Sequence, residues 1–235
     1  MKYAVSLLAG VFTGAALAIF VFLMNPFTSS VELSPLAVSE NPLMILKYSA
    51  VPDDALLYTN DGESRARPQP AGVQLLWEPT IEHTSIAVVA MNDVRGNPAG
   101  FGVKFASLSE STDLFKGEAN IDSVWHVYLP GQGSLFVGQR ENYFDYLRDI
   151  VIPAEWSASK TWKGQWRKNL TSGPGVLGTA AVAGGSGVFR GLQFAAVETY
   201  AATAYSANSG PVAMDGELAI ELPRQSAAEA APEMR

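Results

Sequence analysis

The chain of 235 residues opens with one long apolar stretch and then changes to short, alternating segments. Almost every residue from 4 to 24 is apolar, and about 20 such residues are enough for a helix to cross a bilayer. The alternative is a cleaved signal peptide with Lys2 as its charged region, but the apolar run continues past the small residues that resemble a cleavage site. The pattern favours an uncleaved transmembrane anchor over residues 1–24.

Charges beside the span predict its orientation. Lys2 precedes it and Glu32 is the first charge after it, so the positive-inside rule places the N-terminus in the cytoplasm. We expect a single-pass protein of a bacterial inner membrane, with its main domain in the periplasm. Gly10, Gly14 and Ala18 form a stripe of small residues that would let the helix of a membrane-protein partner approach closely.

Beyond the anchor, short strand-like segments alternate with turns. Residues 25–42 contain three prolines and several serines, which predicts an extended linker. The predicted strands are 43–48, 73–77, 85–91, 100–106, 120–129, 134–139, 179–183, 188–205 and 217–222. Successive short strands with tight turns indicate an antiparallel meander, and closing it into a β-barrel removes the exposed edges.

Composition limits the alternatives. With 48% hydrophobic and 17% charged residues, the chain can bury one core, which we assign to residues 43–222, while residues 223–235 predict a disordered tail. A net charge of −7 argues against nucleic acid as a partner. The chain has no cysteine, and neither His83 nor His126 lies in a ligand-spaced motif, so we expect no metal and no cofactor.

Residues 182–191, "VAGGSGVFRG", are the most distinctive local pattern. Their glycines permit the positive backbone dihedrals of a tight reversal, and apolar β-formers flank them, which predicts a hairpin with a polar tip. An ordinary turn of an antiparallel sheet is the simplest interpretation.

The same string resembles the "GGTGxFRxARG" hairpin of plant dirigent proteins, relatives of the allene oxide cyclase barrels. Over residues 83–222, "SIAVVAMNDV", "GFGVKFAS" and "GSLFVGQREN" stand where that family has a strand ending in "DD", "GxxQGxYxxS" and "GSTLxxxGRN". The resemblance implies a closed antiparallel eight-stranded barrel whose hydrophobic lumen binds small lipophilic molecules. The chain departs from the family at Gln193-Phe194, at Asn92-Asp93 and in a longer connection over 142–178.

Candidate catalytic residues come from this resemblance and from strand periodicity. The resemblance implies that Asp93 is the acidic residue near the pocket and that Arg190 is the signature arginine. In the strand after the turn, a period of two places Arg190, Phe194, Glu198 and Tyr200 on one face. If that face lines the lumen, burial would make Glu198 an acid or a base, whereas on the outer face it would merely be solvated.

Aromatic residues supply the candidates for ligand binding. On residues 120–129, His126 and Tyr128 share one face and Trp125 lies on the other, and one of these faces must point into the barrel. A lone histidine on such a strand is more often structural than functional. The candidate ligand-binding residues are Phe101, Phe105, Trp125, His126, Tyr128 and Phe194.

The connection over residues 142–178 predicts a helix from about Tyr143, which Pro153 ends, followed by a basic segment with Trp156, Trp162 and Trp166. Tryptophan and lysine together suit the lipid headgroup layer. The alternative is a flap whose tryptophans pack on the barrel while its lysines are solvated.

Three functions fit this sequence. The first is a cofactor-independent enzyme that binds a lipophilic molecule and steers its cyclisation, isomerisation or coupling. The second is a non-catalytic accessory subunit of an inner-membrane complex. The third is a lipid or pigment carrier that uses the same lumen.

Overall fold

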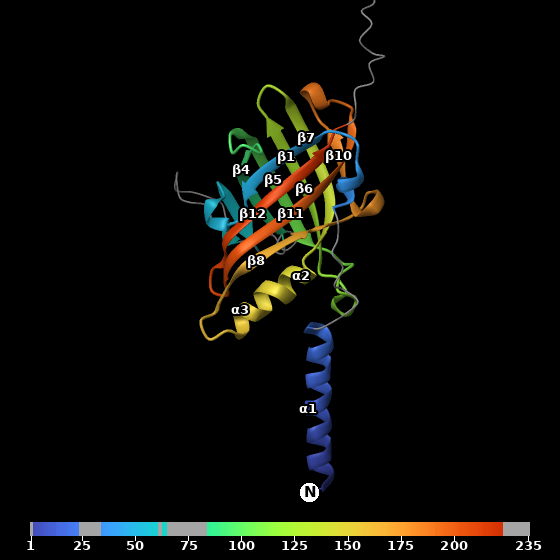
Figure 1. Ribbon diagram of the computed structural model, residues 1–235, viewed down its shortest axis with the longest axis vertical. Helices are drawn as coiled ribbons and strands as arrows, with labels where there is room; N and C mark the ends of the chain where they lie inside the picture. Colours follow the sequence, from blue (N-terminus) through green and yellow to red (C-terminus); the bar gives the residue numbers. More distant parts are fainter. Residues whose placement is uncertain (1, 24–33, 61–62, 65–83, 223–235) are drawn as a thin grey trace, which may run out of the picture.

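The computed structural model describes residues 2–23, 34–60, 63–64 and 84–222, so the expected strand at 73–77 and the expected tail at 223–235 lie outside the described residues. Helix α1 (Lys2–Leu23) stands apart from the rest of the chain, below the sheet in Figure 1. Its window Tyr3–Phe20 has a mean hydropathy of 2.0, and none of this window is buried. By length and composition α1 can cross a membrane, although a signal sequence would meet the same criteria.

Eight strands form a closed antiparallel barrel, which confirms the predicted fold class. Their order around the barrel is β1-β12-β11-β10-β7-β6-β5-β4, and a β1–β4 pairing closes the ring. The strands are β1 (Leu43–Ser49), β4 (Thr84–Asn92), β5 (Pro98–Leu108), β6 (Asn120–Leu129), β7 (Gly133–Asn142), β10 (Ala180–Gly184), β11 (Gln193–Ser206) and β12 (Gly210–Glu221). Strands β2 (Leu57–Asn60) and β3 (Glu63–Ser64) extend the sheet outward from β4.

Alternation along each strand separates the lumen from the outer face. On β6, Ser123, Trp125, Val127 and Leu129 are buried, whereas Val124 and Tyr128 between them are exposed. The inner residues join one core cluster that spans the whole barrel. Removing this apolar area from water stabilises the fold at roughly 25 cal/mol per Å².

The long connection after β7 builds part of the barrel wall. Strand β10 is short and pairs with only one half of β7 and of β11; beyond it, β8 (Thr161–Asn169) pairs with β11 and β9 (Thr171–Gly173) pairs with β7. Leu170, between β8 and β9, donates its backbone N–H to Glu198 O and accepts from Asn142 N, both at 2.8 Å. The connection therefore closes a gap between β7 and β11.

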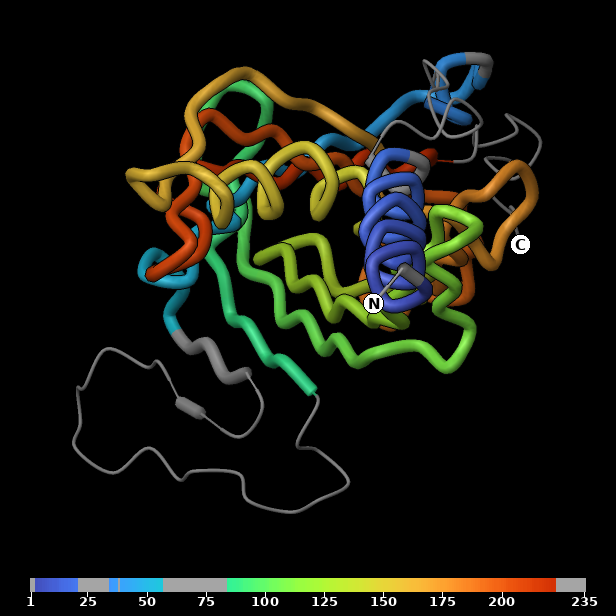
Figure 2. Tube along the Cα trace, turned by 90° about the horizontal axis from the view of Figure 1, so that it is seen from below, coloured from blue at the N-terminus to red at the C-terminus, as the bar shows by residue number. Residues whose placement is uncertain are grey.

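The predicted helix in this connection exists, but Pro153 does not end it. Helix α2 (Phe144–Tyr146), the π-helical turn η5 (Leu147–Val151) and α3 (Ile152–Trp156) follow one another at one end of the barrel (Figures 1 and 2). Proline lacks the N–H that the interior of an α-helix requires. Pro153 lies in the first turn of α3, directly after the π-helical turn η5, where proline is tolerated. The helix thus continues to Trp156.

The glycine-rich string forms the predicted hairpin, with strands β10 and β11 paired in antiparallel fashion. Its loop contains the 3-10 turn η7 (Gly187–Phe189), in which Gly187 adopts φ of 61°. Phe189 is buried and fixes the loop, so β11 begins only at Gln193. The predicted strand start at residue 188 was therefore wrong, and Arg190 lies outside the sheet.

The other short helices of the described residues lie before the first strand or between strands. They are the 3-10 helices η1 (Pro35–Val38), η2 (Pro52–Asp54), η4 (Leu114–Lys116) and η6 (Val176–Gly178).

Candidate functional site

Three charged side chains meet inside the barrel. Lys104 of β5, Glu141 of β7 and Glu198 of β11 all point inward and are at most 7% exposed. Lys104 Nζ lies 2.9 Å from Glu141 Oε2, and 2.9 and 3.0 Å from the two carboxylate oxygens of Glu198. Buried charges are rare unless they are paired, and here one ammonium bridges two carboxylates.

Neutral donors complete the contacts of the carboxylates. Glu198 accepts hydrogen bonds from Tyr48 Oη, from Trp125 Nε1 at 3.1 Å and from Gln139 Nε2. Gln139 also donates to Glu141, which accepts from Ser123 as well. Thr171, on the wall segment β9, donates to Gln139 Oε1 at 2.8 Å and accepts from Glu198 N at 2.7 Å. The connection thus fixes two members of this network.

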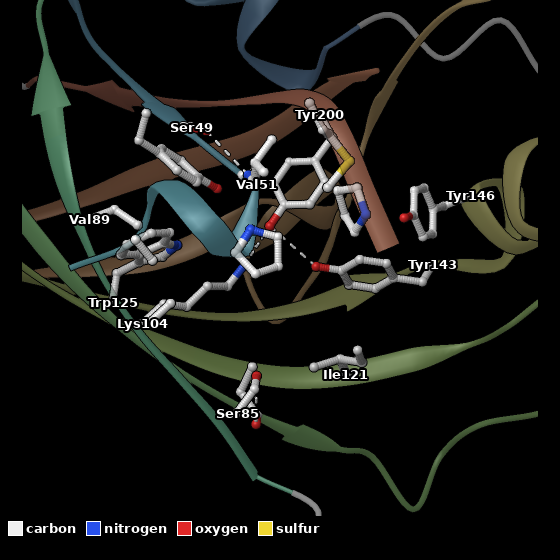
Figure 3. A pocket seen from close by; sticks show the side chains of 18 residues that line it. Ser49, Val51, Ser85, Val89, Lys104, Ile121, Trp125, Tyr143, Tyr146 and Tyr200 are labelled. Atoms are coloured by element: carbon white, nitrogen blue, oxygen red, sulfur yellow. Dashed lines mark hydrogen bonds between the residues drawn. The ribbon is translucent and has the colours of Figure 1, made fainter. Parts of the chain in front are cut away.

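Three phenols surround the ion pairs. Tyr143 Oη donates to Glu141 Oε2 at 2.7 Å and lies 3.4 Å from Tyr200 Oη, which accepts from Lys104 Nζ at 3.4 Å. The rings of Tyr48 and Tyr143 both approach Tyr200 edge-on, with centroids 6.4 and 6.1 Å away. Figure 3 shows Lys104, Tyr143 and Tyr200 converging on one point.

Burial and charge together set the protonation states. Burial lowers the pKa of Lys104, but Glu141 and Glu198 outweigh it, so the pKa stays well above its usual value and the ammonium is charged. Burial raises the pKa of Glu141 against the opposing effect of Lys104. As the pH falls, Glu141 therefore gains a proton at a higher pH than an ordinary glutamate would.

All three phenols are held neutral. Burial is the largest cause of the raised pKa of Tyr48 and of Tyr143, and it raises that of Tyr200 to about 12 although Lys104 opposes it. At physiological pH these hydroxyls are therefore hydrogen-bond donors.

We expect alkaline titration to reveal these three tyrosines. Above pH ~10 the unfolded chain loses phenolic protons that the native barrel retains, so stability falls as the pH rises, by about 1.4 kcal/mol per phenol and pH unit. For three phenols this is about 4 kcal/mol per unit between pH 10 and 12. Absorbance near 295 nm should show all eight tyrosines ionising together in denaturant but fewer below pH 11 in the native protein. A native titration identical to that in denaturant would contradict this assignment.

A cavity of about 300 Å³ adjoins the three phenols and Lys104. Its walls are mainly apolar, and Lys104, Tyr143 and Tyr200 are the polar groups at its inner end (Figure 3). The lining residues near its mouth come from strand ends: Ser49 ends β1, and Ser85, Ile121 and Pro211 are the second residues of β4, β6 and β12. Because neighbouring strands are antiparallel, these ends lie at one end of the barrel, the end that carries α2 and α3.

The structure brings together three of the residues singled out from the sequence: Glu198, Tyr200 and Trp125. The other two candidates for catalysis lie elsewhere. Asp93 belongs to the β4–β5 turn, where its carboxylate accepts from the backbone N–H of Arg95 and Asn97, and hydrogen bonds from Asn97 lower its pKa. Arg190 follows η7 and is exposed. Neither residue reaches the cavity.

Most candidate ligand-binding aromatics point away from the lumen, which corrects their assignment. The register pairs Phe101 with Tyr128, and Phe101, Phe105 and Tyr128 are 41–46% exposed on the outer face. His126 also lies outside, with its ring stacked on Phe136 at 4.6 Å. Phe194 points inward but lines a shallow depression at the other end of β11.

The tryptophans of the connection divide between core and surface. Trp166 is buried, packs edge-on against Tyr146 and donates to Asp149 Oδ2 at 3.2 Å. Trp162 packs against the core, whereas Trp156 is 66% exposed. The packed flap therefore accounts for two of the three residues.

The stripe of small residues on α1 has no partner helix among the described residues. A side chain added at Gly10 or Gly14 would meet no atom within 4 Å, and Ala18 is exposed.

Lys104, Glu141, Tyr48 and Tyr143 were missed by reasoning from the sequence. A usable signal existed on β5, where Lys104 alternates with Gly102 and Ala106, a poor pattern for a solvated face.

Among the described residues, no group of three or more histidines or acidic residues is arranged to hold a metal ion.

Neither a family model nor a curated protein sequence matches the chain. Several chains of solved structures are similar to it, and two have descriptions that follow. One is described as a nonspecific heme-binding cyclase that catalyses 4 + 2 cycloaddition during neoabyssomicin biosynthesis, with 11% identity, a TM-score of 0.38, and coverage of 90% of this chain and 82% of that chain. The other is the Diels Alderase AbmU from Streptomyces koyangensis, with 11% identity, a TM-score of 0.37, and coverage of 90% and 84%.

Proposed function

We propose that the barrel binds a small lipophilic molecule with an oxygen acceptor, such as a carbonyl group, and steers its cyclisation, isomerisation or coupling. The observation that carries this proposal is a mainly apolar cavity whose inner end presents the hydroxyls of Tyr143 and Tyr200 beside the Lys104 ammonium. Apolar walls with a few convergent polar groups are typical of small-molecule sites.

Tyr200 is the residue we assign to the substrate oxygen. Its own oxygen accepts a hydrogen bond from Lys104. Tyr143 donates its one hydroxyl hydrogen to Glu141, so the hydroxyl hydrogen of Tyr200 has only the 3.4 Å contact with Tyr143 Oη and can turn to an acceptor in the cavity. If that acceptor gains negative charge as bonds rearrange, the hydrogen bond strengthens, and the Lys104 ammonium 3.4 Å from Tyr200 Oη stabilises the added charge. No covalent bond to the protein is required.

The carboxylates act as positioning residues. Glu141 and Glu198 keep Lys104 charged and hold it, together with Tyr143, in one geometry. Donors that are already oriented need no rearrangement when the reaction begins, which is the source of electrostatic catalysis in sites closed to water. The apolar walls would fold a flexible substrate into a reactive conformation.

We also propose that α1 anchors the chain in a bacterial inner membrane with the barrel on the periplasmic side. The length and apolarity of α1 support a membrane span, and Lys2 ahead of it supports a cytoplasmic N-terminus.

The test compares two alanines of β4. Ala87 lines the cavity and Ala90, three residues later, is exposed on the outer face. The full chain is purified in mild detergent and its bound small molecules are extracted and identified by mass analysis. We expect a lipophilic molecule with the wild type and with Ala90→Phe, and a loss of about tenfold or more with Ala87→Phe because the new ring fills the cavity.

The same preparation distinguishes the alternatives. An extract without any small molecule, from a chain that co-purifies with a membrane complex, would replace this proposal by the accessory-subunit function. A ligand that is recovered unchanged after prolonged incubation with the barrel would indicate a carrier.

A further inference from the structure

We infer that the end of the barrel around the cavity mouth is a membrane-contact surface, through which the ligand enters from the bilayer. We call this end the rim; its exposed apolar residues are Leu108, Leu114, Phe115, Trp156 and Val212. The route of the ligand rests on the proposed function, whereas the membrane contact does not.

Phe115 is the most exposed of these residues, at 95%, and its neighbour Leu114 is 44% exposed. The loop that carries them is well fixed. Asp113 and Glu118 exchange backbone hydrogen bonds of 2.8 and 2.9 Å, and the Asp113 carboxylate accepts from Phe115 N at 3.1 Å. A rigid loop that holds a phenylalanine away from its own core indicates an apolar contact outside the protein.

The other rim residues lie at the same end of the barrel. Leu108 ends β5 and Val212 lies near the start of β12, beside the cavity residues Ala106 and Pro211. Trp156 ends α3, directly before the turn that leads into β8, whose Thr161 pairs with Ser206 at the end of β11. The apolar residues therefore lie around the opening of the cavity.

The charges of the rim indicate which kind of surface it meets. Residues 51–55, 108–119 and 144–168 contain six basic side chains (Lys116, Arg148, Lys160, Lys163, Arg167 and Lys168) and eight acidic ones (Asp53, Asp54, Glu110, Asp113, Glu118, Asp145, Asp149 and Glu155). A set without an excess of basic residues gives no net attraction to anionic lipid. Contact must come from insertion of apolar side chains, and a bilayer of zwitterionic lipid is sufficient for it.

Helix α1 provides the reason for a membrane near the barrel, because its length and apolarity allow it to cross one. Ten residues, 24–33, separate it from Ser34, and such a segment reaches at most about 40 Å. A membrane-spanning α1 would thus keep the barrel close to the bilayer, and rim contact would turn the cavity mouth toward the lipid.

The chain contains no cysteine, so single labelled cysteines can test this directly. Phe115→Cys and Trp156→Cys carry a nitroxide at the rim, and Val188→Cys carries it in the β10–β11 loop at the opposite end, with an exposure of 65% against 66% for Trp156. The full chain is placed in phosphatidylcholine nanodiscs with one copy each. Collision with membrane-dissolved oxygen and with a water-soluble nickel chelate is then measured by electron paramagnetic resonance.

We expect the labels at 115 and 156 to collide preferentially with oxygen and the label at 188 with nickel, and we expect no change when anionic lipid is added. Labels at 115 and 156 that are as accessible to nickel as the label at 188 would overturn the membrane contact. Shielding from both reagents would overturn it as well, because it would mean a protein contact.

A second variant tests the route of the ligand. In Leu114→Ser/Phe115→Ser, both changed side chains are exposed and outside the cavity, so the fold and the binding of ligand added from detergent should be retained. Uptake of the same ligand from vesicles should slow by about tenfold or more. Unchanged uptake would overturn the bilayer route, whereas loss of binding in Ala87→Phe alone concerns the cavity and leaves the rim assignment intact.

Discussion

Replacing Lys104 by methionine is expected to lower the free energy of unfolding by about 3–5 kcal/mol near pH 8, because two buried carboxylates then lose their shared cation. Methionine fills most of the space of the lysine stem, so the loss reports charge and not volume. The matched control is Lys47→Met on β1, where the lysine is exposed and its replacement should change stability by less than about 1 kcal/mol. Urea unfolding at pH 5 and pH 8 measures both variants.

The raised pKa of Glu141 determines at which pH the Lys104→Met variant loses most stability. The pKa of Glu141 is raised in the native barrel above its ordinary value of 4.5, so the native state holds a proton that the unfolded state loses as the pH rises. Without the ammonium this effect grows, and the variant should be least impaired near pH 5 and most impaired near pH 8. Adding Glu141→Gln should restore at least half of the loss, since it removes one of the stranded charges. Equal destabilisation at both pH values would contradict a charged centre.

Tyr200→Phe is expected to lower turnover of the recovered ligand by about 100- to 1000-fold, the usual effect of removing one donor from a developing oxyanion. Stability should change little, by about 1 kcal/mol, because the lost hydroxyl makes two long hydrogen bonds of 3.4 Å. The control is Tyr128→Phe on the outer face. Turnover and KM are measured separately, and we expect the loss in kcat.

An unchanged kcat in Tyr200→Phe would refute its role toward the substrate. A fall in kcat together with a large loss of stability would show instead that the hydroxyl holds the network together.

The closed barrel could be predicted because the same sequence signal occurs many times along the chain. Strand-like alternation and turn residues recur from Thr84 onward, and the segment 120–129 coincides with β6. Closure follows from general sheet physics, since a meander of this length would otherwise leave two edges open. The hairpin at the glycine-rich string follows in the same way from residues that permit positive φ.

Which face points inward could not be predicted, because both faces of these strands depart from the usual pattern of apolar residues inside and polar residues outside. The outer face carries Phe101 and Tyr128, whereas the lumen carries Lys104 and Glu141. A period of two identifies faces but not their direction. Arg190 shows a second limit: one irregular turn before Gln193 was enough to separate it from the face of Glu198.

The connection after β7 was unpredictable for a different reason. Its strands β8 and β9 gain their role only from partners about 30 positions away, such as Asn169 with Thr199 and Gly173 with Arg140. Local pattern describes a helix and a basic, tryptophan-rich segment, and it cannot show that they complete a wall.

The first and last strands of the barrel, β1 and β12, pair along the whole of β1, from Leu43 with Glu221 to Ser49 with Asp215, and this sets an order of events during synthesis. Lys104 leaves the ribosome 94 positions ahead of Glu198, a delay of about 5–20 s at ordinary rates of translation. Throughout that interval the lysine lacks at least one of its two anions, Glu198, and β1 lacks β12, the partner that pairs along its whole length. The nascent domain therefore remains an open sheet until β12 emerges, and it is in this period that the chain depends most on protection from aggregation.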